Sequence, residues 1–175
     1  MAHFDHIYDI AADNYGLVTA AQARDEGITG VELNRWCKNG WLERLGHGVY
    51  KLTRWAPTHY DVFAEALALV GEGSYLRGTA VLSMHGLALV DPRTIKVATT
   101  KRVRRKLPSW VVVVAAQKGD RTTCYEGIRS QRVADAIREC RRSVLAERLL
   151  DAAGQARLEG LITAGEYAEL LKELS

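Results

Sequence analysis

Four side chains between residues 31 and 38 have the types and the spacing of groups that contact DNA. Val31, Asn34, Arg35 and Lys38 follow one another at helical spacing, so a helix over this stretch places them on one face. An amide and a guanidinium can pair with base edges, and an ammonium can hold a phosphate. The pattern therefore predicts a helix whose polar face binds duplex DNA.

Local signals fix both ends and the buried side of this helix. Thr29 and Glu32 form a capping box, and Gly40 follows the last helical residues. The opposite face carries Leu33, Trp36 and Cys37 at the spacing of a core-facing stripe. We expect a helix over residues 30–39 with its apolar side in a core and Thr29 at the start of its DNA-facing surface.

The elements around this helix have the order of a winged helix-turn-helix. Thr19 and Gln22 form a second capping box for a helix over 20–26, and Gly27 marks a tight corner before Thr29. Two strands are expected over 41–45 and 49–52, with a glycine turn between them. This hairpin, the wing, adds three basic side chains to the predicted DNA surface: Arg44, His47 and Lys51. The alternative is a small solvated helical hairpin with scattered charge.

The stretch resembles the N-terminal domain of the AbiEi antitoxin family. The resemblance rests on Gly16-Leu-Val-Thr, the Gly27-Ile28 corner, Asn39-Gly40-Trp41-Leu42 and Gly46-His47-Gly48-Val49-Tyr50. Further along, Tyr75-Leu-Arg-Gly-Thr-Ala-Val-Leu-Ser-Met-His-Gly-Leu is similar to a second landmark of that family. The basic stretch before Trp110 and the terminal Gly160-Leu-Ile-Thr segment are similar as well.

The rest of the chain predicts an α+β protein, with the winged helix-turn-helix followed by a mixed α/β C-terminal domain. Pro57 marks the boundary, which gives domains over 1–56 and 57–175. Thr58, Thr79, Ser143 and Thr163 are expected to cap helices. Strands are expected at 95–99, 110–114 and 121–125. The run 110–114 is apolar on both faces, so we expect it to be an interior strand.

Positive charge gathers outside the predicted winged domain. Residues 1–56 carry 6 basic and 7 acidic side chains, whereas residues 93–109 carry 7 basic and none acidic. The densest run contributes four candidates for phosphate contact: Lys101, Arg102, Arg104 and Arg105. Arg102 and Arg104 alternate as on a strand edge and would project to one side. The alternative is a solvated loop between strands.

Signals for catalysis or metal binding are weak in this sequence. His3 and His6 have no third ligand nearby, and the three cysteines show no paired spacing, which favours reduced thiols in a cytosol. His85 precedes Gly86 at a helix end without residues that would form a triad. We therefore predict no catalytic residue, metal or cofactor. The first residues do not form a secretion signal, so a cytoplasmic location is expected.

The resemblance implies a function that the residues alone do not give. It implies a transcriptional regulator that binds inverted repeats in its own promoter and an antitoxin of a type IV toxin–antitoxin system of abortive infection. Its partner would be a nucleotidyltransferase toxin, neutralised without need of a stable complex. A protein-interaction adaptor, in which the winged domain binds another protein, is the alternative, and the near-neutral charge of residues 1–56 favours it.

Overall fold

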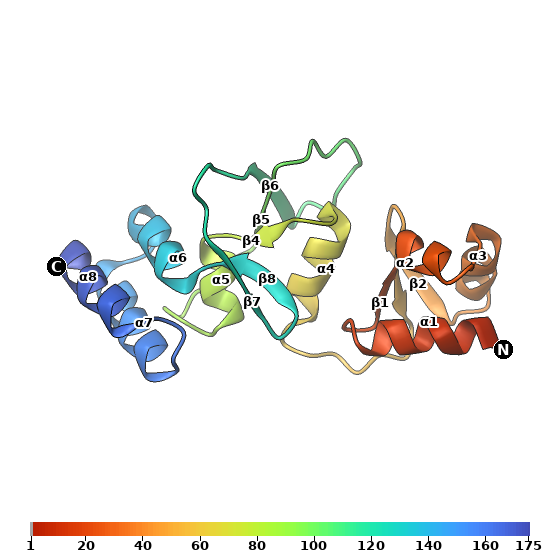
Figure 1. Ribbon diagram of the computed structural model, residues 1–175, viewed down its shortest axis with the longest axis horizontal. Helices are drawn as coiled ribbons and strands as arrows, with labels where there is room; N and C mark the ends of the chain where they lie inside the picture. The colour runs from red at the N-terminus through yellow and green to blue at the C-terminus, as the bar shows by residue number, and fades with distance from the viewer. Residues whose placement is uncertain (1) are drawn as a thin grey trace. The chain divides into compact units, whose positions relative to one another are not determined.

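In the computed structural model, which describes residues 2–175, two sheets of three and five strands organise two separate units (Figure 1). The first unit extends to Glu72 and also includes Arg104–Leu107. The second comprises Gly73–Val103 and Pro108–Ser175. The sequence placed the boundary at Pro57, but the helix after this proline packs with the first unit, so the division falls after Glu72.

The first unit is a winged helix-turn-helix with an additional helix. Its elements are α1 (Ala2–Ala12), β1 (Leu17–Thr19), α2 (Ala20–Asp25), α3 (Gly30–Lys38), β2 (Leu42–Gly46), β3 (Val49–Leu52) and α4 (Asp61–Val70). The three strands are antiparallel in the order β1-β3-β2. The helices expected over 20–26 and 30–39 and the hairpin that follows them are confirmed. β1 was not predicted, because three residues are too few to show a strand period.

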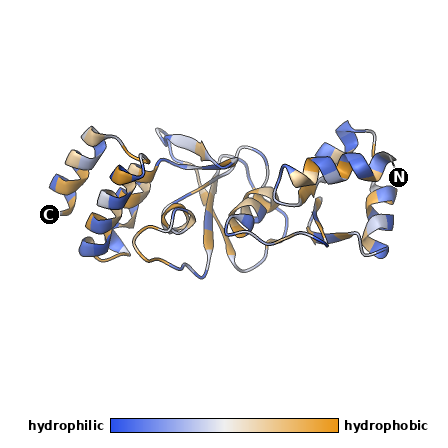
Figure 2. Ribbon diagram, turned by 90° about the horizontal axis from the view of Figure 1, so that it is seen from below, coloured by the Kyte–Doolittle hydropathy of each residue, from blue (hydrophilic) through white to orange (hydrophobic). Residues whose placement is uncertain are grey.

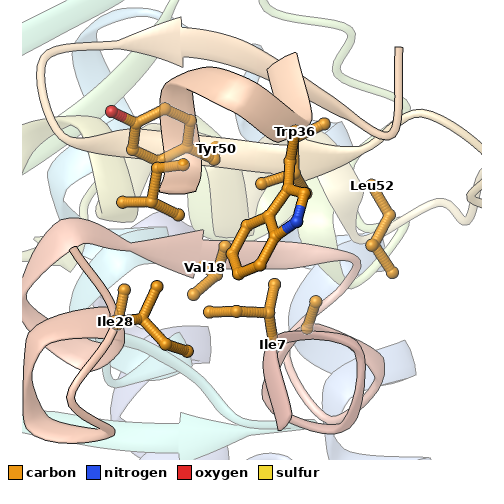
Figure 3. Close-up of a cluster of buried hydrophobic side chains, with 10 residues drawn as sticks. Ile7, Val18, Ile28, Trp36, Tyr50 and Leu52 are labelled. Atoms are coloured by element: carbon orange, nitrogen blue, oxygen red, sulfur yellow. The ribbon is translucent and has the colours of Figure 1, made fainter. Parts of the chain in front are cut away.

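The core of this unit lies between the first three helices and one face of the sheet. Ile7, Val18, Trp36 and Leu52 are buried there among other apolar side chains (Figure 3). The ring of Phe4 packs against Trp36 with centroids 5.3 Å apart. The apolar stripe predicted for α3 is therefore confirmed for Leu33 and Trp36, and Cys37 contacts the cluster while only partly buried.

The additional helix α4 packs against the hairpin. A Cβ on Gly46 would lie 2.5 Å from a methyl carbon of Leu69, so the end of β2 touches α4 closely. The helix begins at Asp61 and its N-cap is Tyr60. The expectation that Thr58 caps this helix is therefore wrong. The Thr58 hydroxyl donates to the Asp61 carboxylate at 2.6 Å instead, before the first helical turn.

The second unit combines a mixed five-stranded sheet with four helices. Its elements are β4 (Tyr75–Leu76), α5 (Thr79–Met84), β5 (Ile95–Thr99), β6 (Val111–Ala115), β7 (Thr122–Tyr125), β8 (Ile128–Gln131), α6 (Val133–Glu139), α7 (Ala146–Leu158) and α8 (Ala164–Leu174), with a short 3-10 turn Cys140–Arg142 after α6. The strand order is β6-β5-β4-β8-β7. β5 and β6 run parallel, as do β4 and β8, and the other pairs are antiparallel.

Several expectations for the second unit need correction. β6 is an edge strand and not the interior strand that its apolar sequence favoured. Thr79 lies inside α5, whose N-cap is Gly78, and Ser143 precedes the N-cap of α7, Leu145. β8 was missed because it directly precedes the helical pattern of α6.

The C-terminal helices follow the sequence signals more closely. Thr163 and Glu166 form the expected capping box at the start of α8. In Figure 2, hydrophobic and hydrophilic residues alternate along these helices, as in helices that bury one face. None of the helices among residues 2–175 is long and apolar enough to cross a bilayer.

Candidate nucleic-acid interface

Reciprocal hydrogen bonds fix the start of both helices of the helix-turn-helix. At α2, the Thr19 hydroxyl accepts from the Gln22 amide at 3.2 Å, and the Gln22 side chain accepts from the Thr19 amide at 2.9 Å. At α3, Thr29 and Glu32 do the same at 3.3 and 2.9 Å. Both predicted capping boxes are thus present, and they set where the exposed residues of α3 begin.

The N-terminal turn of α3 is also tied to α1. Nδ1 of His3 lies 2.8 Å from the Glu32 carboxylate. The backbone N–H of Thr29, the His3 ring and the Thr29 hydroxyl together lower the pKa of Glu32 to about 2. Glu32 therefore carries a negative charge at the positive end of α3, where such a charge stabilises the helix.

The polar face of α3 is exposed as the sequence predicted. Val31 is 78% exposed, and Asn34, Arg35 and Lys38 are exposed on the same side. Within the described residues, no partner holds the side chains of these three polar residues. The face is therefore open to a ligand, with an amide, a guanidinium and an ammonium within about one turn of helix.

The wing has two exposed candidate residues beside a tight turn. Arg44 and His47 are exposed, and the Arg44 Nε donates to the carbonyl of Gly46 at 3.3 Å. The register shifts between Arg44 and Gly46, which marks an irregularity in the hairpin. Gly48 has φ of +69°, a conformation that glycine adopts without strain.

Lys51 is not available to a phosphate, which corrects its assignment to the DNA surface. Its ammonium lies 2.8 Å from a carboxylate oxygen of Asp61 and 2.6 Å from one of Glu65, both on α4. The Lys51 side chain is only 16% exposed. Burial opposes its charge, but the two carboxylates outweigh burial and raise the pKa of Lys51. The alternation of side chains along β3 predicts that Lys51 points away from the core of the first three helices. In the structure, α4 covers that face of the strand.

The basic run, residues 101–106, does not lie on a strand. Residues 100–110 form an irregular loop, so Arg102 and Arg104 do not alternate along a strand as expected. Lys101, Arg102, Arg104 and Arg105 are all exposed. Arg104 and Arg105 belong to the first unit, where Arg105 donates to the carbonyl of Val70 at 3.4 Å, at the end of α4. Lys101 and Arg102 belong to the second unit.

The second unit holds a buried charge network that the sequence did not reveal. The Arg77 side chain is 8% exposed, and its guanidinium donates to Glu139 at 2.7 Å and to Asp120 at 2.6 Å. The Tyr75 hydroxyl also donates to Asp120. Burial and the Asp120 carboxylate raise the pKa of Tyr75 to about 12. The only sequence signal was an arginine inside an otherwise apolar and small-residue stretch.

This network forms one wall of a cleft of about 570 Å³. Lys96, Gln131 and Arg138 also line the cleft. Arg138 lies 3.0 Å from carboxylate oxygens of Glu169 and Glu173, and Lys96 lies 3.4 Å from Glu139. Because the cations of the cleft are paired with carboxylates of the same unit, the network joins strands to α6 and α8 and leaves little net charge for a ligand.

His85 and the three cysteines are the remaining titratable candidates of the sequence. The ring of His85 packs edge to face on Tyr125, with centroids 4.7 Å apart. Burial lowers the pKa of His85, which favours the neutral ring. Cys37, Cys124 and Cys140 are free thiols. Among residues 2–175, no three His, Cys, Asp or Glu side chains gather to hold a metal ion.

Comparison with known families agrees with the geometry of the first unit. Residues 5–53 match the family model described as a transcriptional regulator, AbiEi antitoxin. The match spans α1 to the end of the wing, so the resemblance read from residues 16–52 is confirmed. The matched residues do not include α4 or the second unit. The resemblance of residues 75–87 and of the later segments to the same family therefore stays a prediction. Among curated proteins, none matches the chain.

Proposed function

We propose that this protein is a DNA-binding transcriptional repressor of its own promoter, with α3 in the major groove. The single observation that carries the proposal is the exposed face of Asn34, Arg35 and Lys38 on a helix fixed by a capping box. In helix-turn-helix proteins the second helix lies in the major groove, where side chains of its exposed face contact base edges. The family match over residues 5–53 supports the same function.

The proposal assigns distinct parts to the remaining surface. The wing contributes Arg44 and His47 as phosphate contacts, and the basic run adds sequence-independent attraction. Lys51 takes no part. The targets are inverted repeats, which two copies of the winged unit would occupy.

The second part of the proposal is an antitoxin role in a type IV toxin–antitoxin system of abortive infection. It is supported by the match of residues 5–53 to antitoxin regulators and by the similarity of residues 75–87 to a landmark of that family. The partner is a nucleotidyltransferase toxin, opposed without a stable complex. The protein acts in the cytoplasm, without a cofactor and without catalysis.

Binding to the DNA upstream of the protein's own gene tests the regulatory role. Fluorescence anisotropy compares this duplex with a scrambled duplex of equal composition. Arg35→Ala should weaken binding to the upstream duplex by about 1–3 kcal/mol, the contribution of one bidentate base contact. Arg141→Ala, which removes an exposed arginine of the second unit, is the control and should leave the affinity unchanged.

The protein-interaction adaptor remains the competing function, because residues 1–56 carry 6 basic and 7 acidic side chains and α4 neutralises Lys51. It predicts no preference for the upstream duplex and only weak binding to any DNA at low salt. That result, with a folded protein, would replace the repressor by the adaptor.

A further inference from the structure

The edge strand β6 is unusual for an open sheet edge. It consists of Val111–Ala115, five apolar residues without a charge or a proline, and it lies beside β5 at the end of the strand order (Figure 1). Edge strands normally carry charges, prolines or irregularities that prevent pairing with another chain. β6 has no charge or proline of this kind, and the side chain of Val112 on it is 39% exposed.

The register with β5 determines which backbone groups of β6 face outward. Ile95 donates to the carbonyl of Trp110 at 2.7 Å, and Ala116 donates to the carbonyl of Thr99 at 3.0 Å. In a parallel pair, alternate residues bond to one neighbour, so Val112 and Val114 complete the ladder with β5. The N–H and C=O groups of Val113 and Ala115 therefore point away from β5.

These outward groups complement a second copy of the same strand. An antiparallel pair with its two-fold axis at Val113 lets each Val113 donate to the carbonyl of the other. Each Ala115 N–H then meets the outward carbonyl of Val111, whose own N–H already donates to Pro108 at 3.0 Å. Val112 lies opposite Val114 of the other copy, a pair of β-branched side chains that favours sheet pairing.

We infer that β6 is a self-association surface through which two copies of this chain join their sheets. The same register places Gln117 opposite Ser109, so no like charges face each other at either end of the pair. The other edge of the sheet is different: β7 is polar, and Arg121, next to it, is an exposed arginine paired with Asp135. The inference depends only on the second unit and does not require DNA binding.

Cross-linking tests the register directly in the full chain, with the exposed Cys124 replaced by serine. A cysteine at Val113 would lie opposite its own copy with Cα atoms about 5.5 Å apart, within disulfide range. A cysteine at Val112 would lie diagonally, with Cα atoms about 7–8 Å apart, too far for a disulfide. Val113→Cys should therefore form a disulfide dimer and Val112→Cys should not, although Val112 is on the exposed side.

Sedimentation velocity without DNA provides the second measurement. The wild-type chain should show a monomer–dimer equilibrium, and Val113→Pro should raise the dissociation constant by about tenfold or more, because it removes the two central hydrogen bonds. Val113 N–H is not used by β5, so the melting temperature of this variant should change little. A wild-type monomer at every concentration, or equal cross-linking at positions 112 and 113, would overturn the inference.

Discussion

The ammonium of Lys51 on β3 lies 2.8 Å from the carboxylate of Asp61 on α4, and both side chains are largely buried. Glu65 contributes a second carboxylate at 2.6 Å. The hairpin that serves as the wing is therefore joined to α4 by a cation between two anions. This contact joins α4 to the winged unit and keeps Lys51 away from the proposed DNA surface.

Replacing Lys51 with methionine should affect stability rather than DNA binding. The change leaves two poorly exposed carboxylates without their cation, at a cost of about 2–4 kcal/mol in the free energy of unfolding. Urea unfolding measures this loss. The affinity for DNA of the folded variant should stay within about twofold of the wild type, and a large loss of affinity would return Lys51 to the interface.

The same ion pair makes the stability of the first unit depend on pH. Burial opposes the charge of Asp61, but hydrogen bonds from Lys51 and Thr58 outweigh burial and lower the pKa of Asp61 in the folded protein. Such a group stabilises the fold above its unfolded pKa of about 3.9 and loses this contribution as the pH falls through the folded value. Unfolding free energies at about pH 6 and about pH 3 should therefore differ more for the wild type than for Lys51→Met. Equal differences would mean that Asp61 is not stabilised by Lys51.

The parts of the fold that the sequence predicted are those set by neighbours along the chain. Thr19 with Gln22, Thr29 with Glu32 and Thr163 with Glu166 all form capping boxes, because each pair lies within one helical turn. The candidate surface of α3 followed from the same local spacing.

The parts that the sequence did not predict depend on contacts between distant segments. Lys51 alternates to the outside of the helical core, and only α4, which follows it in the chain, makes that position buried. The apolar run of β6 favoured an interior strand, but no other strand of the described chain pairs with its outer edge. Arg77 finds its carboxylates 43 and 62 residues further along, beyond the reach of any local pattern.

Gly48 should be required for the wing. Its φ of +69° is strained for any residue with a β-branched side chain, and an added Cβ would lie 3.5 Å from that of Ala20. Gly48→Val should lower stability by about 1–3 kcal/mol and weaken DNA binding. Gly127→Val, at a turn of the second unit with φ of +75°, imposes similar strain without touching the wing. It should lower stability but spare DNA affinity, and equal effects of both variants on DNA binding would exclude a local role for the wing.

Arg77 should matter far more to stability than a surface arginine with a similar partner. Arg77→Met leaves Asp120 and Glu139 without the guanidinium that holds them, which should cost about 3–5 kcal/mol. Arg121→Met breaks an ion pair whose arginine is 51% exposed, and because solvent screens such a pair, its loss should cost much less than the loss of Arg77. Chemical denaturation measures the free energy of unfolding of both variants. A similar loss of stability in the two would show that the Arg77 network does not stabilise the second unit more than a surface ion pair does.

The basic run should contribute attraction to DNA that does not depend on sequence. Residues 93–109 carry 7 basic and no acidic side chains, and the run lies in an exposed loop. Each phosphate contact contributes about −0.9 to the slope of log K against log salt concentration. Changing Arg102, Arg104 and Arg105 to glutamine should therefore flatten this slope by roughly 1–3 units. The ratio of affinities for upstream and scrambled DNA should change little, because phosphate contacts carry no sequence information.

A matched variant separates a local contact from a general loss of charge. Changing the exposed Arg141, Arg142 and Arg148 to glutamine removes the same net charge from the second unit, away from the run in sequence. Since Arg105 also donates to the carbonyl of Val70, the melting temperature of both triple variants is measured first. If the two variants flatten the slope equally, the run acts only through net charge. If neither changes it, the loop does not contact the duplex, and DNA affinity must come from α3 and the wing alone.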